Sequence, residues 1–186
     1  MHILIFNASP HSNGNTARLL QAFQSGLPKS AVVTQVDLYT LLPAPCVDCG
    51  LCRTENTCRF SDLEAVGMLL HRADAFVWAL PVYNYSVPAP MKALLDRFQR
   101  YYEAAQNCGK TVFEKQNRPA VLLLSAGRTG LFSVDLIQKQ ITTAGRYVGF
   151  SLRETVFAPK TDREDISPEI ISLARACAEN LQGELL

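Results

Sequence analysis

Two short segments of this sequence are rich in side chains that bind ligands. The first, residues 9–16, reads Ser-Pro-His-Ser-Asn-Gly-Asn-Thr and follows an apolar run at residues 3–6. The run predicts a buried strand, and apolar residues at helical spacing over 17–23 predict a helix that begins near Asn15 or Thr16. The unpaired N–H groups and positive dipole at a helix N-terminus favour an anion. This segment is therefore a candidate phosphate site.

The composition of the loop limits the kind of phosphate that it suits. A P-loop would end in Gly-Lys-Ser/Thr, but the first lysine of the chain is Lys29. The dinucleotide fingerprint needs three spaced glycines, and the loop contains only Gly14. A hydroxyl-rich loop without lysine suits a single monophosphate held without a metal, as in FMN. An ordinary capped turn is the alternative, because Ser, Asn and Thr are also good helix caps.

The second segment is a cysteine-rich loop, residues 43–60. It contains four of the six cysteines of the chain, namely Cys46, Cys49, Cys52 and Cys58. Compact spacing of this kind is typical of iron–sulfur ligands, whereas zinc usually takes two separated C-x2-C pairs. The spacing is compatible with either of two alternatives, a [4Fe–4S] cluster or a loop without metal. The second alternative stays open because free cysteine also packs as a small hydrophobe. A catalytic thiol is less well supported, since no histidine lies near the motif.

The overall composition indicates one soluble domain. The chain has 186 residues, of which 48% are hydrophobic and 19% charged, and its formal net charge is +1. This charge gives no reason to expect nucleic acid or an anionic membrane as a partner. No apolar run is long enough to span a bilayer, and the N-terminus enters a strand without the basic start of a signal peptide. We therefore expect a cytoplasmic protein.

The elements that must position these segments alternate along the chain. We expect strands at residues 2–8, 31–38, 73–80, 119–125 and 147–158, and helices at 15–26, after a capping box at 61–64, at 90–102, 131–144 and 168–182. Residues 41–58 and 107–118 are expected to be loops. This order predicts a single domain, residues 1–186, with a doubly wound five-stranded parallel sheet and helices on both faces.

In such a sheet, ligands bind at the carboxyl ends of the strands where the winding reverses. Residues 9–16, 81–86 and 125–130 follow predicted strands and should meet there. Tyr83, Asn84 and Tyr85 could supply an aromatic face and hydrogen bonds to a flavin ring, unless the tyrosines pack against the next helix. The third loop contains glycine, so its amides can approach the edge of a ring closely. Arg128 could add charge there or simply be solvated.

Taken together, these residues resemble a known family. Residues 9–16 look like the FMN-phosphate loop of flavodoxin-like NAD(P)H-dependent FMN reductases, and residues 81–97 look like their second signature. Residues 45–58 are similar to the cysteine motif of the iron–sulfur flavoprotein branch. The resemblance covers roughly residues 1–150. In one departure, the family commonly has arginine where this chain has His11, which leaves the phosphate with less fixed charge.

The resemblance implies a flavodoxin-like fold that binds FMN. The phosphate would be contacted by Ser9, His11, Ser12, Asn13, Asn15 and Thr16. The ribityl chain and ring would be contacted by Pro81, Val82, Tyr83, Asn84 and Ser86. The pyrimidine edge would be contacted by Ser125, Ala126 and Gly127. The resemblance also implies a homodimer or homotetramer in which a neighbour completes each flavin site.

These observations favour an FMN-dependent oxidoreductase that takes hydride from NADH or NADPH and reduces a quinone, free flavin or other small acceptor. The alternative is an iron–sulfur flavoprotein that relays electrons between FMN and a ferredoxin-like partner through a [4Fe–4S] cluster on Cys46, Cys49, Cys52 and Cys58. A third hypothesis is a non-catalytic phosphate-binding module with a zinc-stapled loop.

Overall fold

The computed structural model describes residues 1–55, 57–109, 112–128 and 130–183 of the chain. Its centre is a five-stranded sheet of β1 (His2–Asn7), β2 (Val32–Asp37), β3 (Ala75–Pro81), β4 (Arg118–Ser125) and β5 (Phe150–Ala158). The strands are parallel and lie in the order β2-β1-β3-β4-β5. The winding therefore reverses between β1 and β3, which confirms the predicted doubly wound α/β fold.

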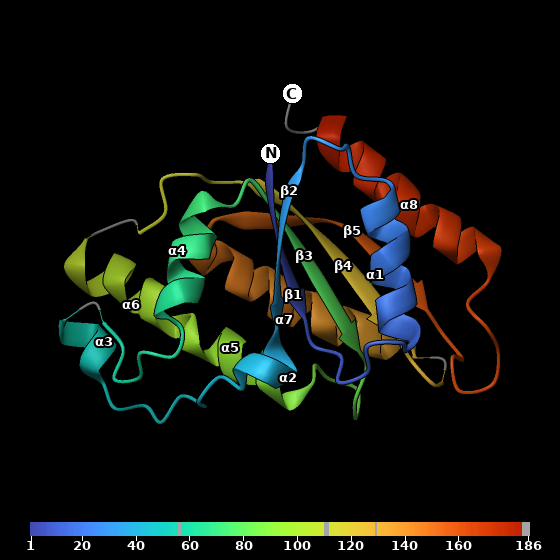
Figure 1. The fold of residues 1–186 in the computed structure, drawn as a ribbon. Coiled ribbons are helices and arrows are strands. Elements are labelled where there is room, and N and C mark those ends of the chain that lie inside the picture. The colour runs from blue at the N-terminus through green and yellow to red at the C-terminus, as the bar shows by residue number, and fades with distance from the viewer. Residues whose placement is uncertain (56, 110–111, 129, 184–186) are drawn as a thin grey trace.

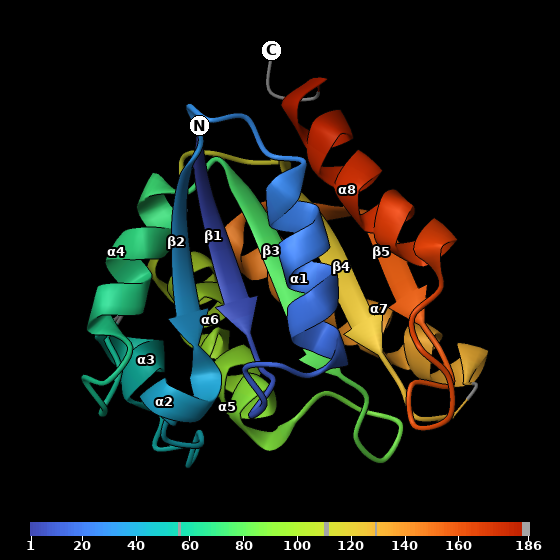
Figure 2. The ribbon, with the colours of Figure 1, turned by 45° about the vertical axis from the view of Figure 1, so that its right-hand side comes forward.

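Helices cover both faces of the sheet (Figures 1 and 2). One face carries α1 (Asn15–Ser25) and α8 (Pro168–Gly183), and the other carries α4 (Glu64–Arg72), α5 (Ala89–Arg97), α6 (Gln99–Cys108) and α7 (Leu131–Val148). Two short helices, α2 (Leu38–Leu41) and α3 (Leu51–Thr54), lie beyond the carboxyl end of β2. None of the helices in the described residues is long and apolar enough to cross a lipid bilayer.

The two-residue period of the strands divides the apolar residues between two cores. In β3, Phe76 and Trp78 face the layer of α4–α7, whereas Val77 and Ala79 face α1 and α8. All four side chains are fully buried. A central parallel strand is covered on both faces, which explains why its sequence is a continuous apolar run rather than an alternating one.

Two helix boundaries differ from the prediction. The expected single helix over 90–102 is a pair, α5 and α6, that meet at Phe98. The expected helix over 131–144 continues to Val148, so β5 begins at Phe150 rather than at residue 147. Gly149 ends this helix in a left-handed conformation with φ 77°, which is a common helix terminator.

The region from 41 to 64 also differs from the prediction. The expected loop over 41–58 contains the short helix α3. The predicted capping box over 61–64 does not form, because α4 begins at Glu64 with no side-chain cap. The carboxylate of Asp62 instead accepts hydrogen bonds from the Ala44 N–H at 2.8 Å and from the Arg97 guanidinium at 2.8 Å. Asp62 thus pairs with a buried arginine from another helix and takes no part in capping α4.

Candidate functional site

The predicted ligand loops lie together at the carboxyl edge of the sheet (Figure 2). Backbone hydrogen bonds connect successive strand ends: Ala8 N–H donates to Ala79 O at 2.8 Å, and Val82 N–H donates to Ser125 O at 2.8 Å. Three loops that are far apart in sequence therefore surround one region beside the β1–β3 switch point.

The first loop leaves the N-terminus of α1 open. Gly14 is the N-cap, no side chain caps the helix, and its first turn contains no acidic residue. His11, Ser12 and Asn13 are exposed next to this helix end. Ser9 shapes the turn, because its hydroxyl lies 3.3 Å from both the N–H and the carbonyl oxygen of His11. The loop thus offers hydroxyl, amide and backbone donors around a helix N-terminus whose first turn holds no carboxylate.

Two predicted phosphate-loop residues point into the protein and join the loops. The hydroxyl of Thr16, a residue only 2% exposed, lies 2.8 Å from the hydroxyl of Ser125 at the end of β4. The Asn15 side-chain amide donates to the carbonyl oxygen of Thr161 at 3.2 Å. Thr161 follows β5, so a fourth loop, which was not predicted, also belongs to this edge.

The second loop contains a two-residue turn that presents aromatic rings to solvent. Tyr83 and Ser86 exchange backbone hydrogen bonds of 3.0 and 2.9 Å, and Asn84 and Tyr85 between them have φ angles of 48° and 63°. Positive φ at both central positions is typical of a type I′ turn. Tyr83 is 40% exposed and Tyr85 64% exposed, so neither ring is buried against the following helix. An aromatic surface is therefore available beside the other loops.

The third loop approaches the loop after β5 closely. A Cβ atom on Gly127 would lie 1.9 Å from a carboxylate oxygen of Asp162, so this contact requires glycine or a displaced aspartate. Ser125 and Ala126 are buried at the base of the loop, whereas Arg128 is exposed. Thr129, within the predicted range 125–130, lies outside the described residues.

A groove of about 510 Å³ adjoins the first loop, and Ser9, Ser12, Gln35 and Tyr39 are among its lining residues. Burial, and secondarily the nearby Tyr83 hydroxyl, raise the pKa of Tyr39, which connects this side of the groove with the second loop. Tyr39 was not among the predicted site residues, because an isolated tyrosine after a strand carries no motif.

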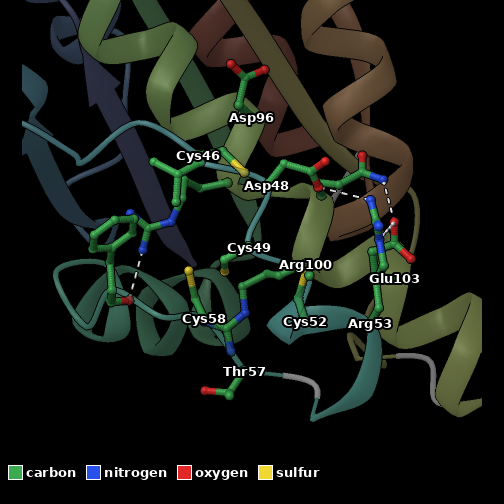
Figure 3. A pocket seen from close by; sticks show the side chains of 15 residues that line it. Cys46, Asp48, Cys49, Cys52, Arg53, Thr57, Cys58, Asp96, Arg100 and Glu103 are labelled. Atoms are coloured by element: carbon green, nitrogen blue, oxygen red, sulfur yellow. Dashed lines mark hydrogen bonds and ion pairs between the residues drawn. The ribbon is translucent and has the colours of Figure 1, made fainter.

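The four clustered cysteines line one small cavity of about 40 Å³ (Figure 3). Cys46 and Cys49 are exposed, whereas Cys52 and Cys58 are partly buried. Burial raises the pKa of the Cys52 thiol, and the negative charge of Glu103 and the neighbouring Cys46 and Cys49 add to this effect. In the described part of the chain, no three Cys, His, Asp or Glu side chains lie close enough to share a metal ion.

A buried arginine closes the cysteine-rich loop at its base. Arg97, on α5, is 4% exposed and donates to the carbonyl oxygens of Ala44 and Phe60, each at 3.0 Å. Its ion pair with Asp62 at 2.8 Å completes the closure. Because Ala44 and Phe60 flank the four cysteines, Arg97 fixes both ends of the segment that carries the thiols.

Comparison with known proteins identifies the family. Residues 1–160 match the family described as NADPH-dependent FMN reductase. The chain belongs to this family.

The curated relatives of this FMN reductase family member include iron–sulfur flavoproteins and an FMN-dependent NADH:quinone oxidoreductase. An iron–sulfur flavoprotein of Methanosarcina thermophila is 40% identical over 99 residues, which cover 52% of each chain. An FMN-dependent NADH:quinone oxidoreductase of Alkalilimnicola ehrlichii is 31% identical over 102 residues, covering 53% of this chain and 50% of that protein. The alignments thus span about half the length of these curated relatives.

A solved NAD(P)H:quinone oxidoreductase from Methanothermobacter marburgensis has the same fold. Its structure superposes with a TM-score of 0.77 over 98% of this chain and 96% of that one, at 22% identity. At this identity the likeness establishes the flavodoxin-like fold of the family member and not its activity.

The residues of the carboxyl edge fit FMN in their chemistry. An uncapped helix N-terminus that has Ser and Asn side chains beside it and no acidic residue in its first turn suits a dianionic phosphate. Exposed Tyr83 and Tyr85 suit a flat ring. Gly127 has no side chain, so its backbone is open to the edge of such a ring. The four thiols of the cysteine pocket are of the kind that ligates an iron–sulfur cluster, but they are not gathered closely enough to share a metal ion.

Proposed function

We propose that this chain is an FMN-dependent oxidoreductase that uses NADH or NADPH to reduce a quinone, a free flavin or another small acceptor. The observation that carries the proposal is the hydrogen bond of 2.8 Å between Thr16 and Ser125, which joins the uncapped helix N-terminus to the end of β4. Phosphate-binding and ring-binding groups are thereby held in one arrangement. Membership of the NADPH-dependent FMN reductase family supports the same activity.

Each loop has a distinct part in binding. The first loop and the start of α1 bind the phosphate, the second loop follows the ribityl chain and the ring face, and the third loop offers amides to the pyrimidine edge, where negative charge develops on reduction. FMN, when bound, supplies the redox chemistry by accepting hydride at N5 and passing electrons to the acceptor. The side chains place the ring and the substrates, so no acid or base is needed for hydride transfer.

Steady-state kinetics test this activity. Purified protein with added FMN should oxidise NADH or NADPH in the presence of a small quinone, with parallel double-reciprocal plots because both substrates use the same exposed ring face in turn. Ser12→Ala should reduce the rate at limiting FMN and recover at saturating FMN. Ser30→Ala, an exposed serine before β2, is the matched control. A protein that binds FMN but oxidises neither nucleotide contradicts the proposal.

A second candidate is an iron–sulfur flavoprotein that relays electrons between FMN and a ferredoxin-like partner. It is favoured by one specific observation, namely that Cys46, Cys49, Cys52 and Cys58 all line the same cavity. The names of three curated relatives, each an iron–sulfur flavoprotein, support it. Protein purified without oxygen should contain iron and labile sulfide and show a broad absorbance shoulder beneath the flavin bands, whereas flavin bands alone contradict it.

Our proposal of an FMN-dependent oxidoreductase also includes one FMN-binding domain over residues 1–186, a homodimer or homotetramer, and a cytoplasmic location. Exposed aromatic residues beside the candidate flavin site, Tyr85 and Phe132, support an assembly that covers them. Light scattering measures the assembly directly: a mass of two or four chains is expected, and a monomer that binds FMN with full activity contradicts it.

A further inference from the structure

The groove beside the first loop lies over a part of the sheet that no helix covers. α1 packs on β3 and β4, and Figure 2 shows the edge strand β2 uncovered next to it. Alternate residues of a strand point to the same face. Val36 packs against the core on the side of α4–α7, so Gln35 and Asp37 point to the open face, where both are exposed.

The lining of this groove is polar but carries no positive charge. Its volume of about 510 Å³ lies within the usual range of small-molecule sites. Gln21 and Gln24 of α1 and Gln35 of β2 line it, and each amide offers both a donor and an acceptor. None of the described lining residues is lysine, arginine or histidine. Arg18, the arginine of α1, is paired with Asp165 at 2.9 Å.

Among the described residues that line the groove, Asp37 alone is charged. Its Oδ1 atom accepts hydrogen bonds from the side-chain amides of Asn7 at 2.7 Å and Gln35 at 2.8 Å. These two bonds orient the carboxylate, and the hydrogen bonds and ion pairs of the described residues include none to Oδ2. An oriented carboxylate with an unpaired oxygen attracts hydroxyl donors and repels a second anion.

The groove is continuous with the candidate flavin site. Ser9 and Ser12 of the first loop line it, and so does Tyr39 of α2. The Tyr83 hydroxyl of the second loop is close enough to contribute to the raised pKa of Tyr39. A molecule in the groove therefore lies beside two of the loops that we propose to hold FMN.

A nucleoside combines the groups that this lining suits, namely ribose hydroxyls and a flat base whose edge both donates and accepts hydrogen bonds. In dinucleotide-binding α/β folds an acidic residue binds the ribose 2′-hydroxyl of NAD, whereas an arginine accommodates the 2′-phosphate of NADP. We propose that the groove binds the adenosine part of the nicotinamide nucleotide, with its ribose on Asp37, and selects NADH over NADPH. This inference rests on the proposed FMN-dependent activity.

The selectivity follows from charge. The 2′-phosphate of NADPH would lie against the Asp37 carboxylate and would meet no cation among the described lining residues. The 2′-hydroxyl of NADH can instead donate a hydrogen bond to the same carboxylate. The chain is thus expected to prefer NADH, although its family is described as NADPH-dependent.

The experiment compares the wild type with Asp37→Asn, Gln35→Lys and Glu179→Gln. Glu179 is an exposed residue of α8 that does not line the groove, which makes it the matched control. Calorimetry measures the binding of 5′-AMP and of adenosine 2′,5′-bisphosphate with FMN at saturation, so that neither probe can occupy the phosphate loop. The ratio of kcat/KM for NADH and NADPH is measured with the same proteins, and urea denaturation confirms that each is folded.

The wild type should bind 5′-AMP about tenfold more tightly than the bisphosphate and should prefer NADH by a similar factor. Asp37→Asn should reduce both preferences to about twofold or less, because it removes the charge, and Gln35→Lys should favour the 2′-phosphate. Glu179→Gln should match the wild type. No preference in the wild type, or an equal preference in Asp37→Asn, overturns this inference alone. FMN-loaded protein that oxidises neither nucleotide overturns the proposed function together with it.

Discussion

The hydroxyl of Thr16 lies 2.8 Å from the hydroxyl of Ser125, although 109 positions separate the two residues. Thr16 belongs to the first turn of α1 and Ser125 ends β4, so β2 and β3 lie between them in the sequence, but both are at the same edge of the sheet. Both are buried, so water does not compete for this bond. The bond fixes the proposed phosphate loop relative to the loop proposed to face the flavin ring.

Thr16→Val should weaken FMN binding about tenfold and lower the free energy of unfolding by about 1 kcal/mol, because it removes one buried hydrogen bond at nearly constant volume. Fluorescence titration with FMN and urea denaturation measure the two effects. Thr143→Val, an exposed threonine of α7, is the control and should change neither. Loss of stability without loss of FMN affinity would show that the bond is only structural.

His11→Arg should tighten FMN binding several-fold, because it adds a permanent cation beside the open helix N-terminus. His11 is exposed on the first loop, so the longer side chain can be accommodated. Riboflavin, which lacks the phosphate, should bind equally well to both proteins, and the gain for FMN should shrink as salt increases. An equal gain for both ligands would place residue 11 away from the phosphate.

Asp62 should make the stability of the cysteine-rich loop depend on acid pH. Burial alone would raise its pKa, but hydrogen bonds from Arg97 and Ala44 outweigh this, so the folded pKa lies below the usual value. The stabilisation is therefore fully present above the unfolded carboxyl pKa, about 3.9, and is lost as pH falls through the lower folded value.

Asp62→Asn should lower the free energy of unfolding by about 2 kcal/mol at pH 7, since it removes a charge-assisted bond to buried Arg97. The variant should also flatten the decline of stability below about pH 4. Asp165→Asn serves as control, because the carboxylate of Asp165, paired with Arg18, is 90% exposed and should contribute little. Equal acid sensitivity of wild type and Asp62→Asn in urea denaturation would refute the assignment.

Arg118→Met should cost about 3 to 5 kcal/mol of stability and leave FMN affinity unchanged. The buried guanidinium, at the amino edge of the sheet, donates to four backbone carbonyls at the ends of α4 and α7, those of Leu70, Ala73, Val148 and Gly149. Burial lowers its pKa to about 10, opposed by Asp74, so the group stays charged at neutral pH. Arg146→Met, at an exposed position near the end of α7, should be nearly neutral.

The parallel, doubly wound sheet and the meeting of three loops followed from sequence because they depend on local signals. The apolar run of β3 and the turn-rich segments after three strands could be recognised one at a time, and parallel topology then places their ends together. The break at Phe98 was not predictable, since apolar residues continue at helical spacing through α5 and into α6.

The missed residues are those whose partners are distant in sequence. Asp62 lies within the predicted capping box over 61–64 at a position that the motif does not specify, and only its contact with Arg97, on another helix, reveals its role. Thr161 and Asp162 lie in a polar stretch without a motif. Because β5 ends beside β4, Thr161 contacts Asn15 and Asp162 lies against Gly127. Pairwise tertiary contacts of this kind leave no periodic or compositional signal in a single sequence.

The most direct test of the account is an equilibrium titration of the purified chain with FMN and, separately, with riboflavin. If the open N-terminus of α1 holds the phosphate and the other loops hold the ring, FMN fluorescence should be quenched to saturation at one FMN per chain, and riboflavin should bind roughly a hundredfold more weakly. Equal affinity for both flavins, or no saturable binding of FMN, would contradict the proposed site.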